Sequence, residues 1–131
     1  MNKKYLAKII AKDYQGLQII SACCANAKIN INEIKYLSKN KIFLLCLERL
    51  GHEKKIKNIK INSVCKFEFV DSVKSKNINQ KKKDLELELL AIHVLKINKN
   101  YEINLIFSEN AYITLSTEII EATLEDQNTN I

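Results

Sequence analysis

Apolar residues recur along this chain with two spacings, and each spacing predicts a different element. Near the beginning, four of them recur at the period of an α-helix, namely Tyr14, Leu17, Ile20 and Cys24. Asp13 stands directly before them and has a side chain suited to an N-cap. We therefore predict one long helix that begins after Asp13 and ends at about Asn26, preceded by a short strand at residues 4–11.

After residue 28 the apolar residues alternate with polar ones, which is the pattern of β-strands. Residues 34–37 and 42–47 form the first predicted hairpin, with Asn40 as the left-handed residue of its turn. We interpret the lysine-rich residues 51–62 as a loop, with a poor edge strand as the alternative. Residues 63–75 alternate again and predict a strand with an irregularity near its middle.

The strongest strand signal begins at Leu85, after a polar, lysine-rich loop at residues 76–84. Leucines at every second position share one face of this strand, and His93 falls in step with them, so we expect His93 to face inward or to lie near a seam. From Leu90 to Val94 both faces are apolar. This change of pattern predicts that the second half of the strand lies centrally in the sheet.

The last predicted hairpin has apolar residues at alternate positions on both strands, and these residues must share one face. A two-residue loop would pair Phe107 with Tyr112, whereas a three-residue loop pairs Phe107 with Ile113. We choose the three-residue loop because it keeps the apolar faces together, and it then pairs Leu105 with Leu115.

A short helix is predicted at residues 117–125, with Thr117 as its cap and with Ile120 and Leu124 docking inward. The tail from about residue 127 is expected to fray. These elements indicate the α+β class, with a mostly antiparallel, strongly curved sheet or a small barrel of about seven strands. One helix follows the first strand, and a short helix ends the chain. A pleckstrin-homology-like barrel is one candidate, based on the strand number and the terminal helix.

Composition places the chain among globular proteins. A chain of 131 residues with 47% hydrophobic and 27% charged residues has the size and balance of one domain, so we expect residues 1–131 to form a single domain. No apolar run is long enough to cross a membrane, and Lys8 and Lys12 interrupt the first apolar stretch, so we expect no signal peptide. The four cysteines lack the spacing of a zinc site or redox motif, and we expect reduced thiols in the cytoplasm, with a disulfide framework as the alternative.

The formal net charge of +6 suggests an anionic partner such as nucleic acid. Two lysine clusters, at residues 54–60 and 81–83, would contact phosphates if the fold brought both loops to one side. The interleaved aromatic residues and arginines of a nucleic-acid-binding surface are missing from these clusters. We therefore interpret them as solvated loops, and nucleic acid is a disfavoured partner.

Two residues are candidates for a partner or anion contact. Arg49 is the one arginine of the chain, and a guanidinium can hold a carboxylate or phosphate through two hydrogen bonds. The preferred explanation of Arg49 is an intramolecular ion pair that fixes a strand end. For His93, the preferred explanation is a buried, hydrogen-bonded histidine, since no supporting residue stands at a useful spacing. We predict no catalytic residue, no metal site and no cofactor.

Hydrophobic motifs in a particular order occur at residues 19–22, 26–27, 36–37, 67–78, 89–92, 105–107 and 121–122, with Phe43 and Arg49 between them. In order and spacing they resemble an uncharacterised alphaproteobacterial family, catalogued as domain of unknown function twenty-nine forty-eight. The resemblance covers nearly the whole chain. It implies glycines where this chain has Asn77, Glu109 and Asn110, an acidic residue at Asn26 and a tryptophan at His52. It implies no reaction, cofactor or ligand.

Three hypotheses about function follow. The leading one is a small cytoplasmic, non-enzymatic binding or adaptor domain that acts through a protein partner, by an exposed sheet edge. The second is weak electrostatic binding of nucleic acid through the lysine-rich loops. The third is an enzyme of unrecognised type, in which His93 and Arg49 supply the acid-base and anion-binding groups. It requires that these two side chains lie together in a cleft.

Overall fold

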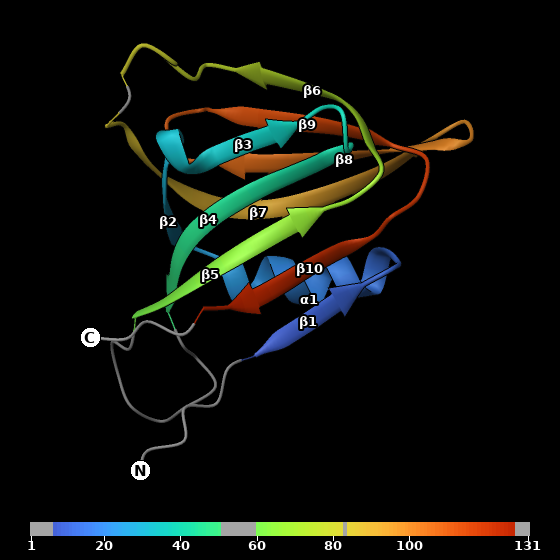
Figure 1. The fold of residues 1–131 in the computed structure, drawn as a ribbon, viewed down its shortest axis with the longest axis horizontal. Coiled ribbons are helices and arrows are strands. Elements are labelled where there is room, and N and C mark those ends of the chain that lie inside the picture. Colours follow the sequence, from blue (N-terminus) through green and yellow to red (C-terminus); the bar gives the residue numbers. More distant parts are fainter. Residues whose placement is uncertain (1–6, 51–59, 83, 128–131) are drawn as a thin grey trace.

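The computed structural model describes residues 7–50, 60–82 and 84–127, which form ten strands, one α-helix and one short 3₁₀ helix (Figure 1). Within these ranges, no helix is long and apolar enough to span a membrane. In chain order the elements are β1 (Lys8–Ala11), α1 (Tyr14–Cys24), β2 (Ala27–Asn30), η1 (Ile31–Glu33), β3 (Ile34–Leu37), β4 (Ile42–Leu50), β5 (Lys60–Phe67), β6 (Val70–Lys76), β7 (Glu86–Ile97), β8 (Asn100–Phe107), β9 (Tyr112–Thr117) and β10 (Ala122–Asp126).

All ten strands belong to one antiparallel sheet that curves strongly without closing into a barrel. The strand order is β1-β10-β5-β4-β2-β7-β8-β9-β6. β2 pairs with β4 at one residue pair, Lys28 with Glu48, and β3 pairs with another part of β4. Figure 1 shows the half from β1 to β4 running diagonally across the half from β7 to β9. The mostly antiparallel, strongly curved sheet is thus confirmed, but the predicted strand number of about seven is wrong.

The three additional strands come from segments with weak or ambiguous patterns. Residues 27–30 form β2, which is too short to give a clear alternation. Residues 63–75 contain the predicted irregularity, but it divides them into β5 and β6 at Phe69, whose φ is 59°. After this break, β6 pairs with β9 and no longer continues the course of β5. The third additional strand is β10, and the order of strands is not a series of sequence-local hairpins.

The predicted C-terminal helix is wrong, because residues 122–126 form β10 between β1 and β5. Ile120 and Leu124 are buried as expected, and their spacing of four fits both a helical turn and two steps along a strand. Ala122, which lies between them, is also buried, and burial of every second residue is the pattern of a strand. The pleckstrin-homology-like candidate depended on this helix and is not supported. Gln127 still donates its N–H to the carbonyl of Asn62, while residues 128–131 lie outside the described ranges.

In the last hairpin the predicted side chains face the core, but the two strands pair in a different register from the predicted one. Leu105 pairs with Ile113, and the two strands are thus shifted by two positions from the predicted pairing of Leu105 with Leu115. Glu109 and Asn110 both have positive φ, at 62° and 55°, so the chain reverses within a tight turn. The N–H of Phe107 donates to the carbonyl of Ala111 and closes this turn. A shift of two keeps each side chain on its face, which explains why the face was predictable and the register was not.

The prediction that His93 faces inward is also wrong. A β-bulge between Leu89 and Ala91 inserts one residue into β7, and this reverses which positions face the core. Ile92 is therefore buried and His93 is exposed. The second half of β7 does not lie centrally either, since its pairing with β2 ends at Leu89. Beyond that point β7 has β8 on one side and α1 near the other.

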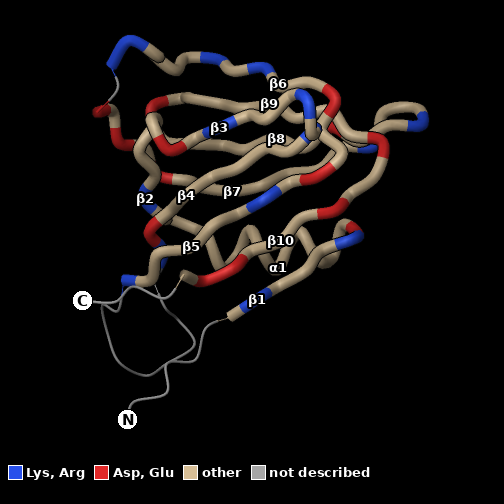
Figure 2. The backbone as a smooth tube through the Cα atoms, viewed as in Figure 1, with Lys and Arg blue, Asp and Glu red and all other residues tan. Residues whose placement is uncertain are grey.

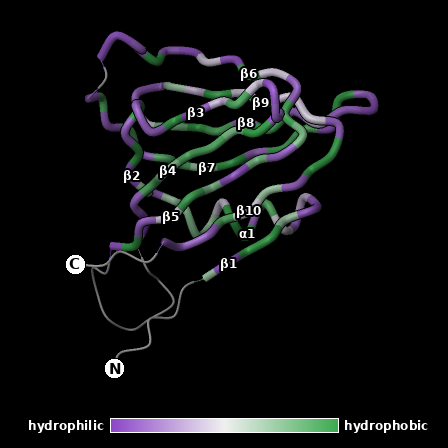
Figure 3. Tube along the Cα trace, in the orientation of Figure 1, coloured by the Kyte–Doolittle hydropathy of each residue, from purple (hydrophilic) through white to green (hydrophobic). Residues whose placement is uncertain are grey.

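Helix α1 begins and caps as the sequence predicts. The side chain of Asp13 accepts a hydrogen bond from the N–H of Gly16, at 2.7 Å. Leu17, Ile20 and Cys24 are buried and join α1 to the core. Figure 3 shows the hydropathy alternating along β7, β8 and β9, whose hydrophobic residues supply much of that core. The predicted helix and the burial of Leu17, Ile20 and Cys24 are therefore confirmed, but Tyr14 of the predicted inner face is 53% exposed.

Several turn residues adopt the left-handed conformation without being glycine. In the first hairpin the left-handed residue is Lys41, with φ of 57°, and not Asn40 as predicted. Asn77, Glu109 and Asn110 also have positive φ, and these are the positions where the resemblance implies glycine. The chain thus keeps glycine-type backbone geometry at these turns with asparagine and glutamate. Of the predicted loop at residues 51–62, residues 60–62 begin β5 and the rest lies outside the described ranges.

Candidate functional site

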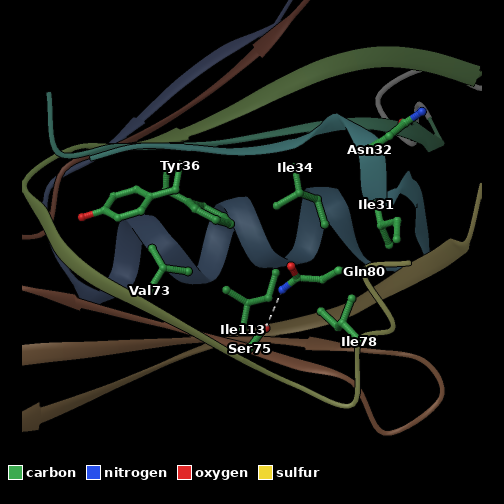
Figure 4. A pocket seen from close by; sticks show the side chains of 10 residues that line it. Ile31, Asn32, Ile34, Tyr36, Val73, Ser75, Ile78, Gln80 and Ile113 are labelled. Atoms are coloured by element: carbon green, nitrogen blue, oxygen red, sulfur yellow. Dashed lines mark hydrogen bonds between the residues drawn. The ribbon is translucent and has the colours of Figure 1, made fainter. Parts of the chain in front are cut away.

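A groove lies where the curved sheet fails to close, between β3 and β6. β3 pairs with β4, β6 pairs with β9, and within the described residues neither strand has a further strand on its other side. The groove encloses a cavity of about 460 Å³, a volume in the range of ligand-binding pockets. Figure 4 shows side chains from β3 and β6 extending toward each other across it. We call it the β3–β6 groove.

The lining of the β3–β6 groove is mainly apolar. It comes from η1, β3 and β4 on one side and from β6, β9 and the loop after β6 on the other. The apolar members are Ile31, Ile34, Tyr36, Phe43, Val73, Ile78 and Ile113, and the polar members are Asn32, Ser75 and Gln80. Phe43 and Ile113 belong to the buried core, whereas Ile34, Tyr36, Val73 and Ile78 are half-buried. The groove is therefore an opening into the core that apolar side chains could enter.

One end of the groove is fixed by contacts around the turn between β3 and β4. The Tyr36 hydroxyl donates a hydrogen bond to the carbonyl of Val70 at 2.7 Å, and the N–H of Val70 donates to the carbonyl of Lys41 at 2.8 Å. The Lys41 ammonium forms an ion pair with Asp71 at 2.9 Å. The hydrogen bond that Lys41 donates to Asp71, followed by the charge of this carboxylate, raises the pKa of Lys41. A side chain of β3, and not a ladder of backbone hydrogen bonds, thus joins β3 to β6 at this end.

The other end of the groove lies near η1 and the loop after β6. There the Gln80 amide donates to the hydroxyl of Ser75 at 3.5 Å, a long contact drawn as a dashed line in Figure 4. The N–H of Ile31 donates to the carbonyl of Leu85 at 3.0 Å and holds η1 against the beginning of β7. Both sides of the groove are therefore anchored to the sheet, and the weak Gln80–Ser75 contact is the part most easily displaced.

Arg49 lies elsewhere, buried at the end of β4. Its Nε donates to Oδ1 of Asp126 at 3.0 Å and its Nη2 donates to Oδ2 at 2.8 Å, and both side chains are at most 1% exposed. Ser63 donates its hydroxyl to the same carboxylate at 2.6 Å, as does the N–H of Ala7 at 2.9 Å. The expected intramolecular ion pair is therefore present, and it joins β4, β5 and β10 to the residue before β1.

This environment determines the charge of Asp126. Burial by itself disfavours the carboxylate, but the hydrogen bonds from Arg49, Ser63 and Ala7 and the positive charge of Arg49 outweigh it. The pKa of Asp126 therefore lies below its usual value. The cluster is stable as an internal ion pair at neutral pH, and it has the character of a structural anchor.

Two buried thiols lie near this anchor. Burial, followed by the neighbouring Cys23, raises the pKa of Cys24 to about 12 against the lowering effect of Arg49. Burial also raises the pKa of Cys65 well above its usual value. Both thiols are therefore protonated at neutral pH and are poor nucleophiles or metal ligands. Within the described part of the chain, no group of three or more His, Cys, Asp or Glu residues is placed to hold a metal ion.

His93 lies on β7 in a second groove, beside α1. Tyr14, Gln18 and Ser21 of the helix contribute to that groove, whose volume is about 510 Å³. The Ser21 hydroxyl accepts the N–H of Ile92 at 3.0 Å and thus occupies the edge of β7 there. The strands of Arg49 and His93, β4 and β7, are separated by β2, and His93 is exposed while Arg49 is buried. The structure therefore does not bring the two candidates together.

The lysine clusters are only partly described. Lys81 and Lys82 are exposed in the loop after β6, at the end of the β3–β6 groove, whereas Lys83 lies outside the described residues. Of the first cluster, only Lys60 is described, and it lies 3.8 Å from Glu48. No motif in the sequence pointed to the groove itself. Alternation placed Ile34 and Tyr36 on a strand, but pairing partners were needed to show that this strand ends the sheet.

Comparison with known proteins identifies the family. The model of one protein family, described as "Protein of unknown function (DUF2948)", matches residues 7–131. The chain belongs to this family. No curated protein and no solved structure matches it. The DUF2948 match confirms the resemblance carried by the hydrophobic motifs, and it covers the β3–β6 groove and the Arg49–Asp126 anchor alike.

Proposed function

We propose that this DUF2948 domain is a non-enzymatic binding module that receives an extended segment of a partner protein in the β3–β6 groove. The observation that carries the proposal is an apolar groove bounded by two edge strands, β3 and β6, which do not pair with each other and which the hydrogen bond from Tyr36 to Val70 joins at one end. An edge strand presents backbone N–H and C=O groups to any chain that can lie beside it. Addition of a strand to such an edge is a common mode of peptide recognition.

β6 is the strand to which the partner segment pairs. It has seven residues, compared with four in β3, and it therefore offers the longer row of backbone groups. Side chains of a paired segment alternate between two faces. Those on the inner face would enter the cavity beside Val73 and Ser75 and contact Phe43 and Ile113. The backbone provides affinity in this arrangement, and the apolar cavity selects the inward side chains.

The proposal is tested by filling the groove without touching the core. Ser75 is exposed and lines the groove, so Ser75→Trp places a large ring in the path of the partner segment. Ser72 is exposed on the same strand and does not line the groove, and Ser72→Trp is the matched control. The probe is a library of random peptides selected on the immobilised protein. Peptides so selected should bind wild type and the control equally and bind Ser75→Trp at least about tenfold more weakly.

Two results would reject this function. One is that the library yields no binding peptide, although similar unfolding temperatures show that wild type and both variants are folded. The other is a set of peptides that bind Ser75→Trp as tightly as wild type, since the contact would then lie elsewhere. Chemical shifts of the methyl groups of Ile34, Ile78 and Ile113 locate the contact directly, because these groups line the groove.

A further inference from the structure

We infer that the partner segment alternates apolar with acidic residues, so that its apolar side chains enter the β3–β6 groove and its carboxylates face outward. This inference rests on the proposed function. Along β6, the groove-lining Val73 and Ser75 alternate with Lys74 and Lys76. On the opposite side, Lys35 stands between the groove-lining Ile34 and Tyr36 of β3. Because side chains alternate between faces, these lysines lie along the outer rim.

The rim is positively charged and unneutralised over most of its length. Figure 2 shows lysines along β6 and the loop that follows it, and on β3. In the described ranges, Lys35, Lys74, Lys76, Lys81 and Lys82 are exposed and form no ion pair within 4.0 Å. Glu33 of η1 lies on the β3 side, Asp71 of β6 is already paired with Lys41, and Glu109 lines a hollow with Asn77 just beyond the end of β6. A segment bound beside β6 therefore meets an excess of cations.

The position of these cations determines which residues of the partner they contact. A strand added beside β6 places its outward side chains opposite or diagonal to Lys74 and Lys76. Opposite charges in such cross-strand positions are favourable and like charges are unfavourable. β6 spans seven residues, so the complementary segment has about seven residues with three outward positions. Apolar residues at the inward positions and Glu or Asp at the outward positions complement both the cavity and the rim.

The test uses three synthetic seven-residue peptides in which valine alternates with glutamate, with glutamine or with lysine, checked to be monomeric at the concentrations used. Affinity for the wild-type protein should fall in the order glutamate, glutamine, lysine. About tenfold should separate the glutamate from the glutamine peptide at low ionic strength, because each favourable charge pair contributes a few-fold. The difference should shrink in 0.5 M salt, since exposed charges are screened over a distance of about 4–5 Å there.

Charge-reversing variants assign the effect to the rim. The double variant Lys74→Glu/Lys76→Glu should reverse the order of the glutamate and lysine peptides. The double variant Lys96→Glu/Lys99→Glu changes the net charge by the same amount on the exposed hairpin between β7 and β8, and it should keep the wild-type order. Equal affinity of the three peptides, or the same order in both double variants, would overturn the acidic-partner inference.

The outcomes separate this inference from the function on which it rests. If the three peptides bind equally and Ser75→Trp weakens all of them, the groove binds extended peptides without regard to charge, and only the inference fails. If none of them binds and the selected library peptides are insensitive to Ser75→Trp, the proposed function fails as well. Random duplex DNA is the third probe. Tight binding of duplex that is lost in Lys74→Glu/Lys76→Glu, with no peptide binding, would identify the rim as a nucleic-acid contact and reject both proposals.

Discussion

Arg49 and Asp126 lie 77 residues apart in the chain and form a buried ion pair with two parallel hydrogen bonds, Nε to Oδ1 at 3.0 Å and Nη2 to Oδ2 at 2.8 Å. Ser63 and the backbone of Ala7 complete the coordination of the carboxylate. The last residue of β10 thus fixes the ends of β4 and β5 and the segment before β1. Asp126, which directly precedes the tail that was expected to fray, is thus one of the best-anchored residues of the fold.

Removing one partner of this pair should strongly destabilise the protein. Asp126→Ala leaves the guanidinium of Arg49 buried without its carboxylate, and we expect a loss of about 3–5 kcal/mol in the free energy of unfolding. Urea denaturation measures it. Glu125→Ala is the matched control, because Glu125 is half-exposed and its ion pair with Lys8 is long, at 3.7 Å. The control should cost less than about 1 kcal/mol. Equal losses for the two variants would mean that the buried ion pair stabilises the protein no more than the exposed one.

The same pair should make stability depend on pH in the acid range. The pKa of Asp126 is lower in the folded protein than its ordinary value of 3.8, so the unfolded chain binds the proton more readily. The contribution of the Asp126 carboxylate to the free energy of unfolding is therefore fully present above the ordinary pKa. It is lost as the pH falls through the pKa of the folded protein. The stability difference between wild type and Asp126→Asn should be constant near pH 7 and should shrink below about pH 4. A difference that grows on acidification would contradict this sign.

The sequence could predict which residues are buried better than it could predict how segments are paired. Hydrophobic spacing located α1, most of the strands and the inner faces of β8 and β9. It failed at Ile120 and Leu124, because a spacing of four suits a helix and a strand equally well. It also failed where the period shifts, as at the bulge after Leu89, since an inserted residue leaves no mark in composition.

The candidate site was even less accessible from the sequence. Arg49 was singled out by its chemistry, and its preferred explanation as an internal ion pair is confirmed. Its partner, Asp126, could not be named, because the contact depends on β10 lying next to β5. The β3–β6 groove depends in the same way on non-local geometry. Tyr36 and Val73 line it from segments 37 residues apart, and neither carries a distinctive motif.

The bulge in β7 makes a prediction about two neighbouring residues. Ile92 is 4% exposed and faces the core, whereas His93 points to solvent. Ile92→Ala should therefore reduce the free energy of unfolding by about 2–5 kcal/mol, and His93→Ala should change it by less than about 0.5 kcal/mol. Thermal or urea unfolding of both variants measures the contrast. Without the bulge, the alternation of Leu87 and Leu89 would predict the opposite assignment, so a larger loss for His93→Ala would place the strand in the other register.

The buried thiols should resist modification in the folded protein. The pKa of Cys24 is raised to about 12 and that of Cys65 is raised well above its usual value, in both cases mainly by burial. At pH 8 the reactive thiolate is therefore rare at both positions, and access is blocked as well. Iodoacetamide labelling followed by peptide mass spectrometry should find Cys24 and Cys65 unmodified in buffer and fully modified in 8 M urea. Rapid labelling of Cys24 in buffer would indicate a more open packing of α1.

Gly16 should be required by close packing despite its cost to the helix. A Cβ atom at this position would lie 2.9 Å from Cα and Cβ of Ala11, closer than such atoms approach in proteins. Alanine gains about 1 kcal/mol in helix propensity over glycine, but displacing β1 from α1 should outweigh it, since overpacking typically costs 1–3 kcal/mol. We expect Gly16→Ala to lower the melting temperature and Gln15→Ala, at the exposed neighbouring position, to leave it nearly unchanged. Because the Ala11 Cα is itself too close, Ala11→Gly should rescue Gly16→Ala only in part. A Gly16→Ala variant more stable than wild type would show that α1 can move away from β1 at no cost.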